Sequence, residues 1–325
     1  MLRRRGSTEL HLARLGARAT ARPANPTFAA IGGLTPRITP VPDFYVVDEA
    51  MVDPVLDPMT WKLAVGGSVR APFSLSFDDL MRLPAVERYQ TLECISDPVG
   101  GGLISTARWE GIPLAEILDR AGVEPGAVEV VFRSADGYSD SLPIGQALDE
   151  RTIVAVGMNG YELPTEHGFP ARLLSLGTYG MKNPKWLTSI DVVDRPYRGF
   201  WETRGWSKAA VVKTGCRIDV PAQGMVVHRE ATGAGLAFSG DRGISAVQVS
   251  TDGGRTWGDA VVEEPLSPST WVRWMYRWVP RLRGVHTLKA RAFDNSGVPQ
   301  AGAWAPPHPN GASGYPEIAV RARVG

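Results

Sequence analysis

Cysteine is scarce in this chain, and its scarcity excludes several kinds of protein. The 325 residues include only Cys94 and Cys216, and neither belongs to a C-x-x-C pair. A disulfide framework, a zinc ribbon and a cysteine-ligated iron–sulfur cluster all need more cysteines at closer spacing. Covalently attached haem is excluded as well, because no C-x-x-C-H sequence occurs.

Neither the charge nor the hydrophobic runs point to nucleic acid or to a membrane span. Lysine plus arginine (35) nearly cancels aspartate plus glutamate (34), so no global field favours nucleic acid or an anionic membrane. No apolar run approaches the roughly 18 residues that a membrane helix needs. Residues 1–6 have the basic flank of an export signal, but a polar segment follows them. We expect these residues to form a basic leader. The alternative is that the chain begins just after a membrane segment that has been removed.

The common nucleotide, hydrolase and metalloprotease motifs are missing. The sequence contains no G-x-x-x-x-G-K-[ST], no G-x-G-x-x-G, no G-x-S-x-G and no H-E-x-x-H. The five histidines are scattered along the chain. The chemistry therefore has to come from another set of residues.

The abundance of turn-forming residues predicts many short strands. The chain has 36 glycines and 26 prolines. We expect residues 1–40 to form a leader or a wrapping arm. Buried strands and two short helices predict an α+β domain over residues 41–205. We expect one helix to start at a capping box of Ser76 and Asp79, and the other to span residues 114–121 and stop at Gly122. Strands separated by turns predict an immunoglobulin-like sandwich over residues 206–325.

Four residues of the last segment are expected to be structural. Trp271, Trp274 and Trp278 fit core and interface positions better than a ligand cage. Cys216 lies near the domain junction, where a buried, unreactive role is the simplest interpretation.

Cys94 is the first candidate for chemistry. It ends a strand-like run and opens a glycine-rich loop, so its thiol is held firmly while remaining approachable. A thiolate is a soft ligand suited to a redox-active metal. The alternative is a small buried hydrophobe, which is the usual role of a lone cysteine.

A second candidate cluster lies about seventy residues further on. His167, Arg172, Lys182 and Lys185 stand among glycines and prolines within twenty residues. Cationic donors on tight loops suit a phosphate or another anion. Ordinary surface cations on turns are the alternative.

The order of these pieces resembles the molybdenum-cofactor domain of the sulfite oxidase family. Besides Cys94 and its loop, the matching motifs are residues 107–114, 134–138, 158–160, 167–173 and 185–186. Residues 243–257 and 291–294 are similar to the sandwich-like dimerisation domain of the same family. The resemblance covers residues 41–325.

The resemblance implies an oxidoreductase that transfers an oxo group to or from a small-molecule substrate. Its cofactor is molybdenum–molybdopterin, a pyranopterin dithiolene that holds molybdenum through two sulfurs, and Cys94 occupies the place of the family's cysteine ligand. The implied cofactor contacts are Phe44, Tyr45, Asp136, His167, Arg172 and Lys185, with Lys182 and Asn183 as their neighbours.

Two positions depart from the family pattern. The loop after the cysteine carries Asp97 and no arginine, and Val156 stands where the family has a tyrosine. Each missing charge-assisted hydrogen bond to an oxyanion is worth roughly 1.5–3 kcal/mol. Sulfite is therefore disfavoured as the substrate, which leaves a sulfoxide, an N-oxide or another sulfur compound.

The resemblance also implies partners and a location. The sequence shows no haem-binding segment before the domain, so we expect a separate electron-transfer protein, with a membrane-bound redox partner as one form of it. A homodimer through the C-terminal domain and an extracytoplasmic or membrane-associated location follow from the family alone. The alternatives are a non-catalytic extracellular binding protein with a degenerate cofactor domain, and a cofactor carrier without turnover.

Overall fold

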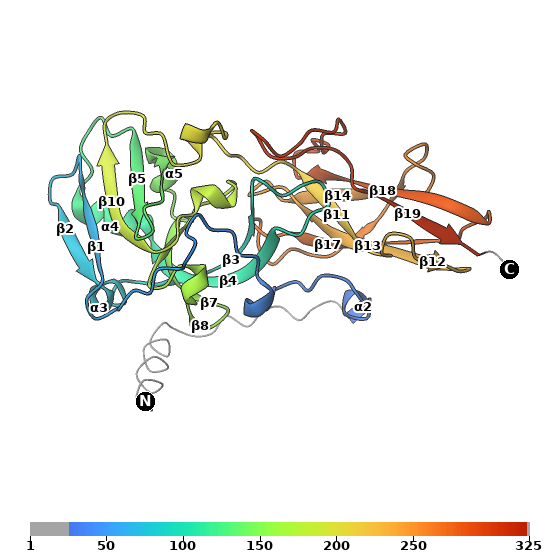
Figure 1. Cartoon of the computed structure of the whole chain (residues 1–325), viewed down its shortest axis with the longest axis horizontal. Coiled ribbons are helices and arrows are strands. Elements are labelled where there is room, and N and C mark those ends of the chain that lie inside the picture. Colours follow the sequence, from blue (N-terminus) through green and yellow to red (C-terminus); the bar gives the residue numbers. More distant parts are fainter. Residues whose placement is uncertain (1–25, 324–325) are drawn as a thin grey trace, which may run out of the picture.

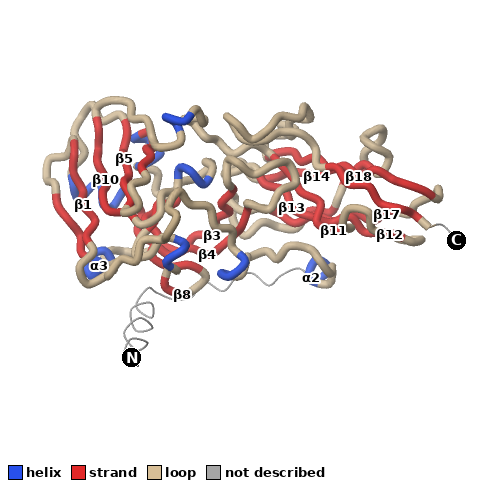
Figure 2. The backbone as a smooth tube through the Cα atoms, viewed as in Figure 1, coloured by secondary structure: helices blue, strands red, loops and turns tan. Residues whose placement is uncertain are grey.

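The computed structural model describes residues 26–323 and shows an elongated molecule built mainly from β-strands (Figure 1). Short helices and long loops connect the strands (Figure 2). The helical share of the predicted α+β domain is small, since the longest helix in the described part has eight residues. The expected basic leader, residues 1–6, lies outside the described residues. Within residues 26–323, none of the helices has the length and apolar character that crossing a membrane requires.

Two sheets build the N-terminal half. The first has the order β2-β1-β10-β5-β6, in which only β1 and β10 run parallel. Its strands are β1 (Lys62–Gly67), β2 (Phe73–Ser76), β5 (Glu129–Ser134), β6 (Ser139–Pro143) and β10 (Leu187–Val193). The second has the order β3-β4-β7-β8, and β9 also pairs with β7. Its strands are β3 (Val86–Glu93), β4 (Ile104–Pro113), β7 (Ile153–Met158), β8 (Tyr161–Glu162) and β9 (Arg172–Leu174).

The helices begin and end where local sequence signals predict. Helix α3 (Phe77–Leu80) starts at the expected capping box, in which Ser76 and Asp79 satisfy each other's backbone N–H groups. Helix α4 (Leu114–Ala121) stops at Gly122, which adopts φ 68 as a left-handed cap. Both predictions are confirmed. The other helical turns are α2 (Pro26–Ala29), α5 (Ile144–Ala147), η1 (Val41–Asp43), η2 (Thr165–His167), η3 (Gly180–Lys182) and η4 (Glu202–Arg204).

Two further sheets face each other in the C-terminal half (Figure 1). One has the order β11-β13-β17-β16 and consists of β11 (Gly215–Val220), β13 (Ala231–Phe238), β16 (Val261–Val262) and β17 (Val272–Trp278). The other has the order β12-β19-β18-β14-β15 and consists of β12 (Val226–Val227), β14 (Ile244–Ser250), β15 (Gly258–Asp259), β18 (Gly284–Asp294) and β19 (Glu317–Ala322). Apolar side chains from both sheets share one core.

The residues expected to be structural in this half are buried. Trp271, Trp274 and Trp278 are 3%, 0% and 8% exposed, which confirms the prediction that they are core residues. Cys216 is also buried, and its thiol lies 3.1 Å from Oε1 of Gln300.

The segment that precedes the first domain packs against the second. Phe28 is 1% exposed, and the guanidinium of Arg273 lies 5.6 Å from its ring centre. The backbone N–H of Thr35 donates to Asp219, and the indole of Trp271 donates to the backbone oxygen of residue 37. Residues 28–37 therefore lie along the C-terminal half as an arm, and Thr39 then joins β4 of the N-terminal half through two hydrogen bonds with Thr106.

A shared apolar cluster joins the two halves. It contains Ile95 and Tyr179 from the N-terminal half and Leu236, Phe238 and Trp271 from the C-terminal half. The loop that carries Cys94 is thus packed between both halves, which fixes its position. The cavity described next opens beside it.

Candidate active site

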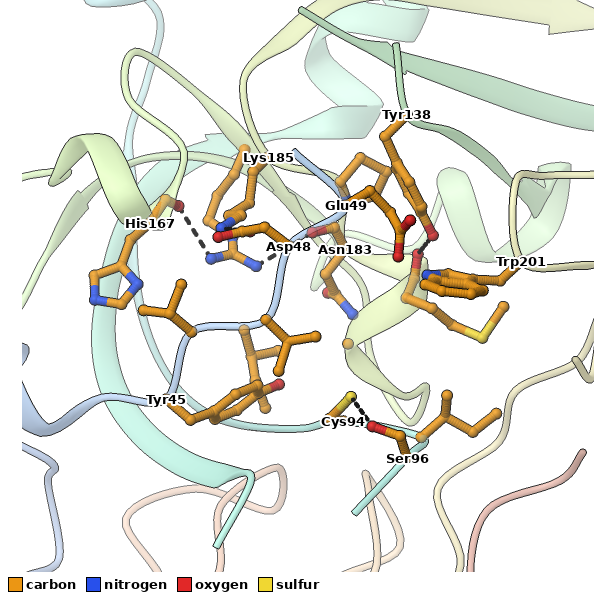
Figure 3. Close-up of a pocket in the computed structure, with 18 of the residues that line it drawn as sticks. Tyr45, Asp48, Glu49, Cys94, Ser96, Tyr138, His167, Asn183, Lys185 and Trp201 are labelled. Atoms are coloured by element: carbon orange, nitrogen blue, oxygen red, sulfur yellow. Dashed lines mark hydrogen bonds and ion pairs between the residues drawn. The ribbon is translucent and has the colours of Figure 1, made fainter. Parts of the chain in front are cut away.

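A cavity of about 290 Å³ contains most of the predicted functional side chains (Figure 3). This volume is near the lower end of the range usual for ligand pockets. Five chain segments line it, namely residues 44–49, 92–96, 136–138, 167–186 and 201–206. Of the nine predicted site residues, eight line the cavity: Phe44, Tyr45, Cys94, Asp136, His167, Arg172, Asn183 and Lys185.

Cys94 presents its thiol to one end of the cavity. It follows the last residue of β3, and its backbone N–H donates to the oxygen of Leu103 across the loop. The Sγ atom lies 3.0 Å from the hydroxyl of Ser96. Burial raises the pKa of the Cys94 thiol, so the free side chain stays protonated at neutral pH. A thiolate at this position therefore needs a metal or another cation beside it.

Asp97 closes the loop after Cys94 and does not face the cavity. Its Oδ1 accepts from the backbone N–H of Leu103 at 3.0 Å, and its side chain is buried. A Cβ at Gly101 would lie only 2.1 Å from the same oxygen, so the loop needs glycine there. The acid in this loop thus has a structural contact.

Arg172 is the buried cation at the other end of the cavity. Its guanidinium donates to the backbone oxygens of His167 and Asn183, at 3.0 and 3.2 Å, and lies 5.3 Å from the ring centre of Trp109. Burial lowers its pKa to about 10, so the group remains charged at neutral pH. Its Nε is buried without a hydrogen-bond partner in the described part of the chain.

His167 is held beside Arg172 in its neutral form. Burial lowers the pKa of His167 to about 4, and the neighbouring Arg172 adds to this effect. Its Nε2 is buried and has no hydrogen-bond partner among residues 26–323. An unsatisfied buried nitrogen is costly unless a ligand meets it, and the Nε–H of Arg172 suits a phosphate oxygen. The neutral His167 ring donates its one N–H to the backbone of Val41, so its Nε2 is an acceptor until a neighbouring anion favours the protonated ring.

Lys185 completes this end of the cavity. Its ammonium forms an ion pair with Asp48, donates to the backbone oxygen of Glu166 at 2.7 Å and lies 4.3 Å from the ring centre of Trp186. Burial lowers its pKa, and the hydrogen bond with Asp48 opposes this shift. Asp136 lines the same cavity, where burial raises its pKa.

Two glycines allow the segments around the cavity to approach closely. Gly168 has φ 108, and a Cβ on it would lie 2.9 Å from Cβ of Lys185 and 3.1 Å from Cβ of Arg172. At Gly180, a Cβ would lie 2.8 Å from the hydroxyl of Tyr45. The glycine-rich spacing of the sequence motifs therefore has a direct steric reason.

Phe44 and Tyr45 connect the two ends of the cavity. Their rings are 5.6 Å apart and nearly parallel, and Phe44 also meets the His167 ring edge-on at 5.2 Å. Burial raises the pKa of Tyr45 well above its usual value, and both Cys94 and Arg172 are near enough to influence it. Tyr45 is thus a neutral hydroxyl between the thiol and the cationic end.

Lys182 lies outside the cavity, which corrects its expected role as a cofactor neighbour. Its side chain is 3% exposed and turns away from the cavity. There it donates to Asp140 at 2.6 Å and pairs with Glu202. Its neighbours Met181 and Asn183 do line the cavity, because consecutive side chains of a tight turn point in different directions.

Sequence reasoning missed several residues that line the cavity. Residues 46–49 follow the predicted aromatic pair, and Glu49 faces the same cavity as Tyr138 (Figure 3). Trp201 and Trp206 come from the end of the domain, where no motif distinguished them from core tryptophans. Only the tertiary structure brings residues 201–206 beside Cys94.

The two ends of the cavity differ in chemistry. Figure 3 shows His167 and Lys185 on one side and Cys94, Ser96 and Trp201 on the other. Among the described residues, Arg172 and Lys185 are the only lysine or arginine side chains in the lining. Val156, in place of the family's tyrosine, is 1% exposed in the core and does not line the cavity.

This arrangement fits a molybdopterin cofactor. The unsatisfied Nε–H of Arg172 and the adjacent ammonium of Lys185 suit a phosphate, and the thiol of Cys94 suits a soft metal. No group of three or more His, Cys, Asp or Glu side chains in residues 26–323 could hold a bare metal ion. A metal bound at Cys94 would take its other ligands from the cofactor.

Comparison with known proteins identifies the family. Residues 50–201 match the model of the oxidoreductase molybdopterin binding domain. Mitochondrial sulfite oxidase of Mus musculus is 32% identical over 308 residues, which cover 80% of this chain and 56% of that protein. The chain thus spans about half the length of this curated relative. An uncharacterized oxidoreductase of Bacillus subtilis, YuiH, is 33% identical over 154 residues, which cover 47% of this chain and 76% of that protein.

A solved structure has the same arrangement along most of the chain. The sulfane dehydrogenase SoxCD from Paracoccus pantotrophus superposes with a TM-score of 0.75 at 25% identity, over 83% of this chain and 77% of that chain. Sequence relatives, domain model and fold agree with the cavity chemistry. The chain belongs to the sulfite oxidase family of molybdopterin-binding oxidoreductases.

Proposed function

We propose that this protein is a molybdenum-cofactor enzyme that transfers an oxo group to or from a small neutral or dipolar compound, such as a sulfoxide or an N-oxide. The observation that carries the proposal is the two-ended cavity. A thiol stands at one end, and buried His167 and Arg172 with unsatisfied nitrogens stand at the other. A cofactor that carries a metal and a phosphate would suit this arrangement of donors.

Each side chain has a defined part in the proposal. Cys94 ligates the metal, while His167, Arg172 and Lys185 hold the pterin phosphate and ring system. Phe44, Tyr45, Asp136 and Asn183 complete the pterin pocket. The bound cofactor supplies the redox chemistry, and the chain supplies position, charge and access.

The lining near Cys94 argues against sulfite as the substrate. An oxyanion gains roughly 1.5–3 kcal/mol from each hydrogen bond to a charged donor. The two cations of the lining, Arg172 and Lys185, lie at the end of the cavity that is proposed to hold the pterin phosphate. Trp201, Trp206, Met181 and Ile95 pack near the thiol instead, with the acid Glu49 in the same lining. Such surroundings favour a substrate without net negative charge.

The partners and the domain roles are part of the same proposal. Removing oxygen from a sulfoxide consumes two electrons and two protons and releases water, and a separate redox protein would supply the electrons. We retain the division at residues 41–205 and 206–325. The two-sheet C-terminal half is proposed to be immunoglobulin-like and to form a homodimer, as the family resemblance implies.

Elemental analysis with a substrate panel tests the proposal. Protein from a host that assembles the cofactor should contain about one molybdenum per chain and reduce sulfoxides or N-oxides faster than it oxidises sulfite. Cys94→Ser should lower turnover at least about a hundredfold while the fold persists, because a metal contributes several kcal/mol to catalysis.

Cys216→Ser is the matched control for the loss of one thiol. Cys216 is buried against Gln300 and does not line the cavity, so its variant should keep both molybdenum and turnover. Wild-type protein without molybdenum or oxidised pterin would refute the proposal and favour the non-catalytic binding protein.

A further inference from the structure

Residues 199–206 form one wall of the cavity, and we call this segment the tryptophan strap. Trp201 and Trp206 line the cavity, with ring centres 6.3 Å apart and ring planes 76° apart. Both rings pack against the cluster that contains Ile95, the residue after Cys94, and Met181. Figure 3 shows Trp201 across the cavity from His167 and Lys185.

The strap is anchored by a side chain that points away from solvent. Glu202 is 7% exposed, accepts from Lys182 and accepts the backbone N–H of Gly199 at 3.3 Å. Glu202 therefore links the strap's first residue, Gly199, to its middle and joins the strap to Lys182 of η3.

Lys182 joins the strap to two segments that lie beside it. Besides Glu202 of the strap, its ammonium contacts Asp140 at 2.6 Å and the backbone oxygen of Ser141 at 3.2 Å. Residue 182 itself follows Met181 in η3, and Met181 accepts through its backbone oxygen from the Tyr138 hydroxyl at 2.7 Å. One ammonium thus connects the strap, the start of β6 and η3.

The remaining contacts leave the strap little freedom. A Cβ on Gly199 would lie 2.9 Å from the Asp140 carboxyl, so the strap lies directly on β6. At its other end, the Trp206 ring meets His308 at 5.0 Å, and the N–H of Ser207 donates to Pro309 at 3.0 Å.

The ion cluster has a geometric consequence. Lys182, Asp140 and Glu202 are each less than a tenth exposed, and buried charges are tolerated only when their partners are held closely. Without the ammonium, the two carboxylates would face each other across the gap that it fills. Two buried carboxylates at close range either separate or take up a proton, and either change removes the ion pairs that hold the strap in place.

We propose that the tryptophan strap is the substrate-recognition wall of the enzyme and that Lys182 is the positioning residue that holds it. The inference rests on the proposed oxo-transfer function. The wall recognises the apolar substituents of a sulfoxide or an N-oxide, and the indole faces attract its positively polarised sulfur or nitrogen. Lys182 therefore acts on substrate selectivity through Trp201 and Trp206, without touching cofactor or substrate.

The test compares two sulfoxides of different apolar size on the molybdenum-loaded enzyme. Dimethyl sulfoxide and methyl phenyl sulfoxide are reduced with reduced methyl viologen. Two molecules of the dye each donate one electron, two protons are taken up from water, the S–O bond breaks, and a sulfide and water form. We expect Lys182→Met to raise KM for the phenyl compound about tenfold. KM for dimethyl sulfoxide should change less than about twofold, because little of its surface reaches the wall. Molybdenum content and kcat should stay near wild-type values.

Matched variants separate positioning from general destabilisation. Lys208→Met removes another lysine–glutamate pair, with Glu129, outside the cavity, and should leave both KM values unchanged. Glu202→Gln keeps the side-chain size and should shift selectivity in the same direction as Lys182→Met. Trp201→Ala should shift selectivity in the same direction and leaves the three side chains of the ion cluster in place. It therefore tests the role of the tryptophan strap even if Lys182→Met fails to fold.

The outcomes distinguish this inference from the proposed function. A wild-type enzyme that lacks molybdenum or reduces neither sulfoxide refutes the proposed function. An active wild type whose Lys182, Glu202 and Trp201 variants keep the same ratio of KM values refutes the role of the strap. Equal loss of kcat with both substrates would show that Lys182 is merely structural.

Discussion

At the residue scale, burial decides which charges the cavity can use. Arg172 stays charged because two backbone oxygens and the Trp109 ring replace water around its guanidinium. His167, beside it, is kept neutral by burial, and the neighbouring Arg172 adds to this effect because it would repel a second cation. Arg172 therefore brings the charge that binds a phosphorylated group, and a phosphate beside His167 would raise the pKa of the imidazole again.

The neutral state of His167 predicts a pH dependence of stability in cofactor-free protein. Its pKa is about 4 when folded, against 6.5 in the unfolded chain, so only the unfolded state gains a proton between these values. The contribution of His167 is complete above pH 6.5 and is lost as the pH falls toward 4. The loss amounts to about 3 kcal/mol by pH 4, since each pKa unit is worth about 1.4 kcal/mol.

Urea unfolding of wild type and His167→Gln at several pH values measures this loss. The difference between the two free energies of unfolding should shrink as the pH falls from 7 to 4, because glutamine does not titrate. A constant difference would show that the imidazole is not kept neutral by its surroundings.

At the element scale, local signals determine where helices begin and end, while contacts between segments determine which residues meet. The capping box at Ser76 and the glycine stop at Gly122 were predictable because each depends on a few adjacent residues. The direction of the Lys182 side chain was not predictable. It depends on Glu202 and Asp140, which belong to other elements.

Gly168 is the element-scale position most sensitive to substitution. Gly168→Ala places a Cβ 2.9 Å from Lys185 in a backbone with φ 108, so steric contact and backbone strain add. We expect a loss of about 2–4 kcal/mol in the free energy of unfolding, measured by urea titration. Weaker pterin retention should accompany it, because His167 and Lys185 flank the turn.

Gly145→Ala is the control for this prediction. Gly145 lies in α5, and a Cβ there meets nothing within 4 Å. Alanine should be neutral or stabilise by about 0.5–1 kcal/mol, as expected for a helix interior. Equal effects of the two substitutions would contradict the steric explanation for Gly168.

At the scale of the whole molecule, the two halves hold the loop that carries Cys94 between them. The backbone N–H of Trp271 donates to the Thr91 hydroxyl at 2.9 Å, and Thr91 lies in β3, close to Cys94. The Trp271 indole also donates to the arm that precedes the first domain. The C-terminal half thus helps to support the proposed metal ligand.

This support predicts coupled unfolding of the two halves. Calorimetry of the wild type should show a single transition, because the shared cluster links both halves. Trp271→Ala should cost about 3–5 kcal/mol and separate the halves into two transitions. Two transitions in the wild type would contradict the coupling.

Residue types and short motifs were enough to predict the family, which the comparisons show, and the many strands with their turns. They also predicted a soft ligand and an anion-binding cluster, and those two roles stay predictions. These features depend on the identity of neighbouring residues within short segments, which folding does not alter. Cys94, His167 and Arg172 were therefore recognisable as site residues from their local motifs.

The walls of the cavity, in contrast, follow from tertiary contacts. These contacts turn Lys182 out of the cavity, place Asp97 in a loop contact and bring Trp201 and Trp206 beside the thiol. Each of these placements depends on segments far apart in the chain. Close packing and the pairing of buried charges select them, and neither leaves a signal in local sequence.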